Sequence, residues 1–456
     1  NWVVAAAAVL FLFQGQAIAN ERGYDDPKIE FEKYKLANGL EVILHRDNKV
    51  PLVGVNVWYH VGSGDETPGK SGFAHQFEHM LFQGSKHVGE DRHFEVLKNI
   101  GGTGVNGTTN PDRTNYFEVV PSHQLETALW LESDRMGYLL PVLTKKSLDN
   151  QIEVVRNERR QRYDNVPYGK TRFVKAALMY PEGHPYRYLT IGKHTDLTNA
   201  TLEDVVGFYK KWYAPANATL VIAGDFETAE AKKLVEKWFG SLPKAAKPER
   251  QKVPAPVITK TKRKKVQDQF AKLRRLEYVW ASPAFYSAGD AELDLFAHAL
   301  AANGVGRLYE ILVHDKQLAQ NIMAYQGSRQ FSSEFTIAVT LKNDADLGKV
   351  EAIINQELDK LMTKPMSKAE FDRAVVNMEK QFIWGLESLM ARANTLQSYN
   401  HFLGNPDYIT KDLDRWRKSN PAKVQQVANK ILQKNKRIEV LTVPAAKAAR
   451  GPKGGK

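Results

Sequence analysis

Residues 73–82 read Phe-Ala-His-Gln-Phe-Glu-His-Met-Leu-Phe. Side chains four positions apart in an α-helix lie on the same face, so His75 and His79 can present two imidazoles to one cation. Glu78 follows His75 by three positions and therefore lies beside them. The apolar residues of the stretch would pack this helix into a core. The pattern predicts a largely buried helix that carries part of a metal site.

The chain contains no cysteine, so a zinc site must use histidine and carboxylate ligands. A catalytic zinc has three protein ligands and an open position for water. Two neutral imidazoles and one carboxylate leave the site positively charged, which lowers the pKa of bound water to about 7, and Glu78 can then take its proton. The alternative is that the two histidines and the glutamate lie together on a surface by chance. A third ligand elsewhere in the chain would argue for a metal site.

A helix predicted over residues 147–161 offers that third ligand. Its buried face is defined by apolar residues at helical spacing, Leu148, Ile152 and Val155. Glu158 lies three positions beyond Val155 and borders this face. Glu153 lies about 140° around the helix from Glu158 and should point to solvent. Glu158 is therefore the better candidate.

The inverted order His-x-x-Glu-His, with a later Glu158 in a Val-Val-x-x-Glu-Arg context, resembles the inverzincins. Within them the chain resembles the pitrilysin/insulinase family, and in particular the short subunits related to mitochondrial processing peptidase. The match covers nearly the whole chain and includes residues 36–40, 72–75, 132–136, 154–159 and 217–221. The resemblance implies a zinc metalloendopeptidase with one zinc ion per chain, bound by His75, His79 and Glu158, and with Glu78 as general base.

Two departures from the family pattern stand out. Many members carry a second glutamate seven residues before the ligand, where this chain has Gln151. Gln151 can still hydrogen-bond a group next to the ligands, but it adds no negative charge. Active members often carry an Arg and a Tyr that hold the substrate near the zinc, and Val313 and Gln320 occupy these places here. We therefore expect the catalytic subunit of a heterodimer whose partner supplies the pair, with a homodimer as the alternative.

The resemblance also places a substrate-binding edge strand at residues 102–109, with Asn106, Gly107 and Thr108 at its centre. An edge strand with small residues lets an extended peptide add to the sheet through main-chain hydrogen bonds. Asn106 could also bond a peptide carbonyl near the metal. A glycine-rich turn is the alternative interpretation.

At 456 residues the chain is too long for one ordinary core. A proline-rich segment without amphipathic period separates two halves, and both halves end in a helix followed by an apolar strand. The patterns predict an α+β fold of two related domains, each a mostly antiparallel sheet packed by helices. The resemblance implies that they form half of a clam-shell chamber. The expected boundaries are a catalytic domain at 28–243, a linker at 244–265, a second domain at 266–446 and a disordered tail at 447–456.

Two further elements are expected from local patterns. Ser367 and Glu370 form a capping box that opens a long helix to about residue 401. Residues 1–19 resemble the remnant of a signal peptide, because an apolar run is followed by Ala17-Ile18-Ala19. The alternative is a membrane anchor, but about 11 apolar residues are too few to span a bilayer. We therefore expect export, to the periplasm.

The net charge of +12 is spread along the chain. A solvated surface is the simpler reading, and steering of an acidic partner is the alternative. No aromatic-plus-basic module indicates nucleic acid.

Together these observations predict an exported zinc endopeptidase that hydrolyses peptides or unfolded segments. Two alternatives remain: a non-catalytic peptide-binding or scaffold homologue, and a peptidase dedicated to processing one precursor. The first usually lacks a ligand or the base, whereas all four residues are present here.

Overall fold

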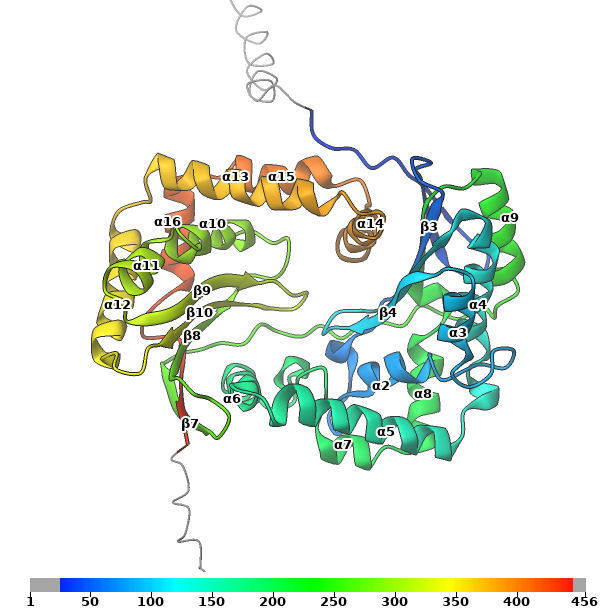
Figure 1. Cartoon of the computed structure of the whole chain (residues 1–456), viewed down its shortest axis with the longest axis horizontal. Helices are drawn as coiled ribbons and strands as arrows, with labels where there is room; N and C mark the ends of the chain where they lie inside the picture. The colour runs from blue at the N-terminus through cyan, green and yellow to red at the C-terminus, as the bar shows by residue number, and fades with distance from the viewer. Residues whose placement is uncertain (1–24, 446–456) are drawn as a thin grey trace, which may run out of the picture.

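The computed structural model describes residues 25–445, which fold around two β-sheets (Figure 1). The predicted signal-peptide remnant at 1–19 and the predicted tail at 447–456 lie outside the described residues. Among the described residues, no helix combines the length and the apolar character needed to cross a membrane.

The first half of the chain forms a six-stranded sheet in the order β1-β2-β6-β3-β5-β4. Its strands are β1 (Glu32–Lys35), β2 (Glu41–Arg46), β3 (Leu52–Tyr59), β4 (Thr103–Thr109), β5 (Thr114–Pro121) and β6 (Ala218–Gly224). The second half forms a five-stranded sheet in the order β7-β11-β8-β10-β9. Its strands are β7 (Lys262–Asp268), β8 (Arg275–Ser282), β9 (Ala319–Gly327), β10 (Ser333–Leu341) and β11 (Ile438–Pro444).

The two sheets have the same plan. In each sheet one pair is parallel, β2 with β6 and β7 with β11. The remaining pairs are antiparallel in the same order. The strands β4 and β9 therefore occupy equivalent edges. This confirms the predicted fold of two related domains built on mostly antiparallel sheets.

The helices of the first half pack mainly on one face of its sheet. They are α2 (Phe73–Met80), α3 (Arg92–Asn99), α4 (Leu125–Tyr138), α5 (Lys145–Arg159), α6 (Gly169–Met179), α7 (His194–Thr198), α8 (Leu202–Trp212) and α9 (Thr228–Phe239). Because side chains alternate along a strand, one set of β3 residues enters this core, namely Val53, Val55, Val57 and Tyr59.

The helices of the second half are α10 (Asp290–Ala301), α11 (Arg307–Tyr309), α12 (Leu347–Thr363), α13 (Lys368–Gly385), α14 (Leu389–Leu403), α15 (Ile409–Arg417) and α16 (Pro421–Ile431). Most of them bury their apolar faces against the second sheet.

Each half also lends one helix to the other half. In Figure 1, α14 of the second half lies against the first sheet, where Leu396 and Tyr399 pack with Ile43 and Val221. In return, α6 of the first half packs on β7, β8 and β11. Every residue of β6 is buried, because helices cover both of its faces. The exchange joins the two halves into one body.

The structure corrects one predicted element and shifts another. The expected continuous helix from Ser367 to about residue 401 is two helices, because the chain turns after Gly385 and Ser388 caps a new helix through the amide of Ala391. Glycine at this point weakens helix continuation and serine favours a new start. The segment between α9 and β7 has no helix or strand, and β7 begins at Lys262, inside the predicted linker at 244–265.

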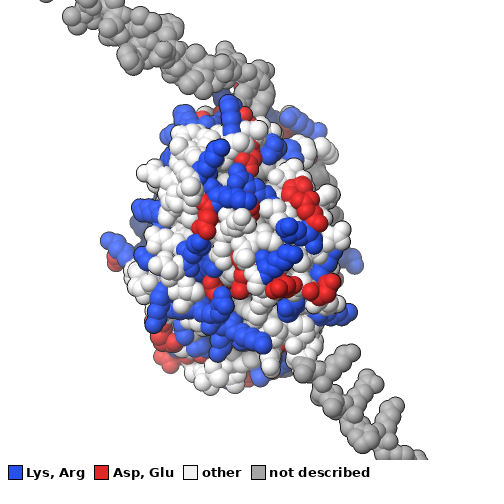
Figure 2. All heavy atoms as spheres, turned by 90° about the vertical axis from the view of Figure 1, so that its left-hand side faces the viewer, with Lys and Arg blue, Asp and Glu red and all other residues white. Residues whose placement is uncertain are grey.

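Figure 2 shows the side of the molecule formed by the second half, where Lys and Arg cover much of the surface with acidic residues between them. The outer strand β7 contributes four exposed basic residues, Lys262 to Lys265. Charged side chains on an edge strand oppose pairing with another chain.

Candidate metal centre and peptide-binding edge

Helix α2 is held at its N-terminus by a buried carboxylate. Its N-cap, Gly72, has φ 94°, a conformation that glycine adopts without a steric penalty. One Glu66 carboxylate oxygen accepts from the Gly72 amide at 2.9 Å, and the other accepts from the Ala74 amide at 2.9 Å. These bonds satisfy donors that a helix leaves free at its start. Phe77 then anchors the helix by stacking on Phe208, with ring centroids 5.5 Å apart.

Helix α5 brings the third predicted residue to the same place. Thr144 caps it by accepting from the Ser147 amide, and Leu148, Ile152 and Val155 are buried as expected. Glu153 is exposed and pairs with Arg156, also as expected. Glu158 lies in the last turn, and the chain continues as a short π-helix that carries Arg162.

The three predicted ligands converge. Glu158 Oε2 lies 3.1 Å from His79 Nε2 and 3.5 Å from His75 Nε2. The two imidazole rings are 4.8 Å apart and nearly perpendicular. Two ring nitrogens and one carboxylate oxygen that face a common point match the donor set of zinc. Their role as ligands remains a prediction.

Arg162 orients the carboxylate. Its Nη1 lies 2.8 Å from Glu158 Oε1, so the other oxygen, Oε2, faces the imidazoles. Burial alone would raise the pKa of Glu158, but the hydrogen bond with His79 and the neighbouring positive charges lower it. Burial, reinforced by His79, lowers the pKa of His75 to about 4. At neutral pH the site therefore offers a neutral imidazole and an ionised carboxylate, the protonation states that metal binding requires.

Glu78 lies between this cluster and the edge strand. Burial, the largest effect, raises the pKa of its carboxyl, which makes the carboxylate a stronger proton acceptor. A Cβ at Gly107 would lie 3.0 Å from Glu78 Cγ and 2.9 Å from Phe82 Cε2. A larger residue at this position would force the Glu78 or Phe82 side chain to shift. The contact places the predicted base directly beside the edge strand.

Strand β4 is the edge of its sheet, as predicted, rather than a turn. The Asn110 amide donates to the Arg113 carbonyl at 3.0 Å. Bonded pairs alternate along an antiparallel ladder, so Thr108 and Asn106 bond inward to β5, while Gly107 and Thr109 present their main-chain groups outward. Asn106 is exposed, and its Oδ1 accepts from the Gly107 amide at 2.9 Å. The outward groups form a site where a peptide strand can add.

The positions that depart from the family pattern are also located. Gln151 is buried on α5 and lines a separate cavity of about 360 Å³ with Met80 and Ser147. Within residues 25–445 no hydrogen bond joins it to His75, His79 or Glu158. In the second half, Val313 is partly buried against the second core, and Gln320 is exposed on the edge strand β9.

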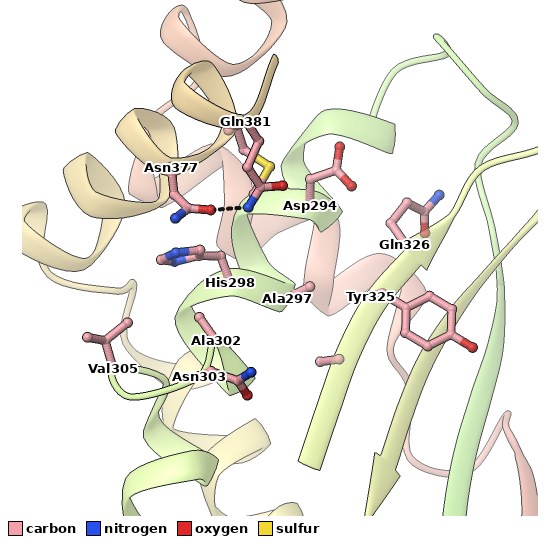
Figure 3. A pocket seen from close by; sticks show the side chains of 12 residues that line it. Asp294, Ala297, His298, Ala302, Asn303, Val305, Tyr325, Gln326, Asn377 and Gln381 are labelled. Carbon is pink, nitrogen blue, oxygen red and sulfur yellow. Dashed lines mark hydrogen bonds between the residues drawn. The ribbon is translucent and has the colours of Figure 1, made fainter. Parts of the chain in front are cut away.

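The second half has a cavity of about 490 Å³ at the place equivalent to the His–Glu cluster (Figure 3). It lies between α10, β9 and α13, as the cluster lies between α2, β4 and α5. Figure 3 shows Asp294 and His298 on α10 facing Asn377 and Gln381 on α13. Among the described residues, this cavity has no group of three metal-binding side chains. The three predicted ligands and the predicted base all lie in the first half.

Two other clusters have metal-binding residue types. His93, Glu118 and Glu132 are fully buried, but Arg135 donates to both His93 and Glu132, so a guanidinium already supplies the positive charge. The second cluster, Glu310, His314 and Asp315, is largely exposed, and acidic surface groups commonly gather without a metal.

Sequence reasoning did not identify Glu66 or Arg162. Glu66 precedes the helix cap by six residues, and its role depends on a loop that folds back. Arg162 could have been found, because it lies four residues after Glu158, the spacing at which opposite charges pair on a helix.

Comparisons with known proteins show the family of the chain. The family model described as "Insulinase (Peptidase family M16)" matches residues 41–180, and the one described as "Peptidase M16 inactive domain" matches residues 199–378. The chain is 30% identical over 394 residues to the zinc protease PqqE of Helicobacter pylori, across 84% of this chain and 87% of that protein. The chain belongs to the pitrilysin/insulinase family of peptidases.

Solved structures show the same fold. A protease from Helicobacter pylori superimposes with a TM-score of 0.85 at 28% identity, covering 92% of this chain and all of that one. The first half of the periplasmic protease PqqL from Escherichia coli superimposes with a TM-score of 0.76 at 18% identity, covering 92% and 93% of the two chains. The family fold, including its half-shell architecture, is therefore that of this chain.

Proposed function

We propose that this chain is a zinc-dependent endopeptidase that hydrolyses peptides or unfolded polypeptide segments. The observation that carries the proposal is the convergence of His75, His79 and Glu158 next to Glu78 and an open sheet edge. In this proposal the first three residues would hold one zinc ion, which supplies a Lewis acid that polarises the scissile carbonyl and activates water. The named relatives, which are zinc proteases, support the same assignment.

The chain's own residues account for the remaining work. An extended peptide adds to β4 through the main-chain groups of Gly107 and Thr109, with Asn106 turning from the Gly107 amide to the peptide. Glu78, whose pKa is raised by burial, accepts a proton from the attacking water and delivers it to the leaving amine. Arg162 keeps one oxygen of Glu158 directed at the imidazoles.

The quaternary proposal is a heterodimer in which a partner supplies an Arg/Tyr pair. Its support is that Val313 has no polar side-chain group, and that Gln320 has neither the charge of Arg nor the phenol of Tyr. We also propose export to the periplasm. Its support is the pattern of residues 1–19 and the Escherichia coli relative, which is described as periplasmic.

A non-catalytic peptide-binding homologue is the second candidate, since the second half matches a domain described as inactive. The two candidates differ in whether Glu78 matters for turnover. Zinc content and cleavage of a mixed peptide library would be measured for the full chain, for Glu78→Gln and for Glu90→Gln, a control at an exposed glutamate.

On the proposal, all three proteins hold one zinc ion, and only Glu78→Gln loses turnover, by about 10²- to 10⁴-fold. Unchanged cleavage by Glu78→Gln would contradict the catalytic assignment. Cleavage of one library member rather than many would favour a processing peptidase. Full activity of the chain alone as a homodimer, measured by light scattering after gel filtration, would contradict the heterodimer.

A further inference from the structure

A third cavity lies on the face of the first sheet opposite α2. Its volume is about 530 Å³, it is open to solvent, and residues of β3, β5 and α14 line it. Its lining includes the aromatic side chains of Trp58, Phe117, Tyr286, Phe382 and Tyr399. Thr108 of the edge strand β4 lies on its rim, so the cavity opens beside the place where a peptide strand would add.

Arg113 enters this cavity, and the charges of Glu78 and Asp112 favour its ionised form. Arg113 Nη1 donates to the Thr108 carbonyl at 2.8 Å and to Asn115 Oδ1 at 2.9 Å, and it also contacts the Thr108 hydroxyl. Its Nε is buried and has no hydrogen-bond partner. No Asp or Glu within residues 25–445 forms an ion pair with it. Burial, the largest effect, lowers the pKa of Arg113 to about 10.

The guanidinium is held in a fixed position. Three acceptors share Nη1, and the group lies over the Trp58 ring, 5.0 Å from its centroid. Among the described residues, the edge formed by Nε and Nη2 makes no hydrogen bond, and its Nε is buried. Two parallel N–H groups on one edge match the two oxygens of a carboxylate, and a buried donor without an acceptor is costly. The other charged residue of the cavity, Asp412, is already bonded to Tyr399 and Arg415.

The edge strand makes this group reachable from a bound peptide. A strand added to β4 lies about 4.8 Å from it, and its alternate side chains point to the face that carries Asn106 and Thr108. Arg113 is hydrogen-bonded to Thr108 of β4. An acidic side chain on that face of the added strand therefore has to reach past only one residue, Thr108, to contact Arg113.

We propose that this cavity binds a carboxylate of the peptide substrate through the Nε and Nη2 atoms of Arg113, with the aromatic walls covering the apolar stem. The inference rests on the proposed peptidase function and adds a preference for substrates that carry an acidic side chain, or a C-terminus, at one position. If Arg113 had only a structural role, the hydrogen bonds that Nη1 makes to Thr108 and Asn115 would be sufficient.

The test measures peptide binding without turnover. Zinc-loaded full chain carrying Glu78→Gln is titrated into short fluorescein-labelled peptides, and fluorescence anisotropy gives Kd. One arm compares Glu with Gln at each position in peptides with amidated C-termini. The other arm compares free and amidated C-termini. Each arm is repeated with Arg113→Gln, with Arg113→Lys, which keeps the charge but not the two-pronged edge, and with Arg92→Gln on α3 as a control for net charge.

We expect one arm to show about tenfold tighter binding of the carboxylate form, as a charge-assisted hydrogen bond provides. Both Arg113 variants should remove this difference, whereas Arg92→Gln should retain it. The proposal is overturned if no carboxylate is preferred, or if Arg113→Lys, whose fold is the least perturbed, keeps the preference. Binding without discrimination overturns this inference alone, whereas absence of binding by every peptide overturns the proposed function as well.

Discussion

Replacing Glu66 should loosen the start of the helix that carries both predicted histidine ligands. The side chain is buried, and its two oxygens accept from the amides of Gly72 and Ala74. In Glu66→Ala both amides lose their acceptor in a buried environment. Each unsatisfied donor costs about 1–3 kcal/mol, so the gross loss is about 2–6 kcal/mol.

The net loss should be smaller than that sum. Burial raises the pKa of Glu66 well above its usual range, which means that the ionised form is itself costly in the folded protein. Removing the carboxyl recovers part of this cost, and we expect a net loss of about 2–3 kcal/mol at the helix terminus. Glu66→Gln keeps one acceptor and should lose roughly half as much.

The assay is local, because a chain of two domains need not unfold in one step. Hydrogen exchange measured by mass spectrometry over residues 72–80 reports the opening of α2. A loss of 2–3 kcal/mol speeds exchange there by about 30- to 150-fold. Zinc affinity, measured by competition with a chelator, should fall with it. Glu203→Ala, at an exposed glutamate in the first turn of α8, serves as the control. Exchange in Glu66→Ala that matches this control would refute the reasoning.

Three further outcomes are expected. Gly107→Ala should lower kcat/KM for peptide cleavage by at least about tenfold and leave the zinc content unchanged. The reason is that the new Cβ would lie 3.0 Å from Glu78 Cγ and 2.9 Å from Phe82 Cε2. Equal kcat/KM for variant and parent would contradict this. Arg162→Gln should lower the affinity for zinc by about tenfold. Because Arg162 is exposed, salt screens its charge, and the difference in affinity between variant and parent should shrink in high salt. A loss of affinity that does not depend on salt would indicate misfolding instead. Burial lowers the pKa of His60 to about 3 and that of His401 well below its usual value. Below about pH 6.5 these two imidazoles therefore bind protons in the unfolded chain but not in the folded chain. The free energy of unfolding should fall as the pH drops from 6.5 toward 3, by up to about 1.4 kcal/mol per pH unit for each imidazole. Urea unfolding at several pH values should show a shallower slope for His401→Phe than for the parent or for His123→Gln at the surface.

Much of the site was readable from the sequence, because it depends on local periodicity. The spacing of His75, Glu78 and His79 places them on one side of a helix wherever that helix lies, and the apolar period of α5 placed Glu158 at the border of a buried face. The edge strand predicted at 102–109 is β4, which spans Thr103–Thr109. These are properties of neighbouring residues, and a single chain segment is enough to determine them.

Tertiary structure decided what depends on partners distant in the chain. Each of α6 and α14 packs its apolar face on the sheet of the other half of the chain. The residues in contact are far apart in the sequence, so the local pattern of apolar residues does not predict this exchange. The same holds for the loop that brings Glu66 to the amides of α2, for the close approach of Gly107 on β4 to Glu78, and for the buried Nε of Arg113, which has no hydrogen-bond partner. The sequence determined which side chains could do the chemistry, and long-range packing decided their neighbours, because burial and contact are properties of the whole fold.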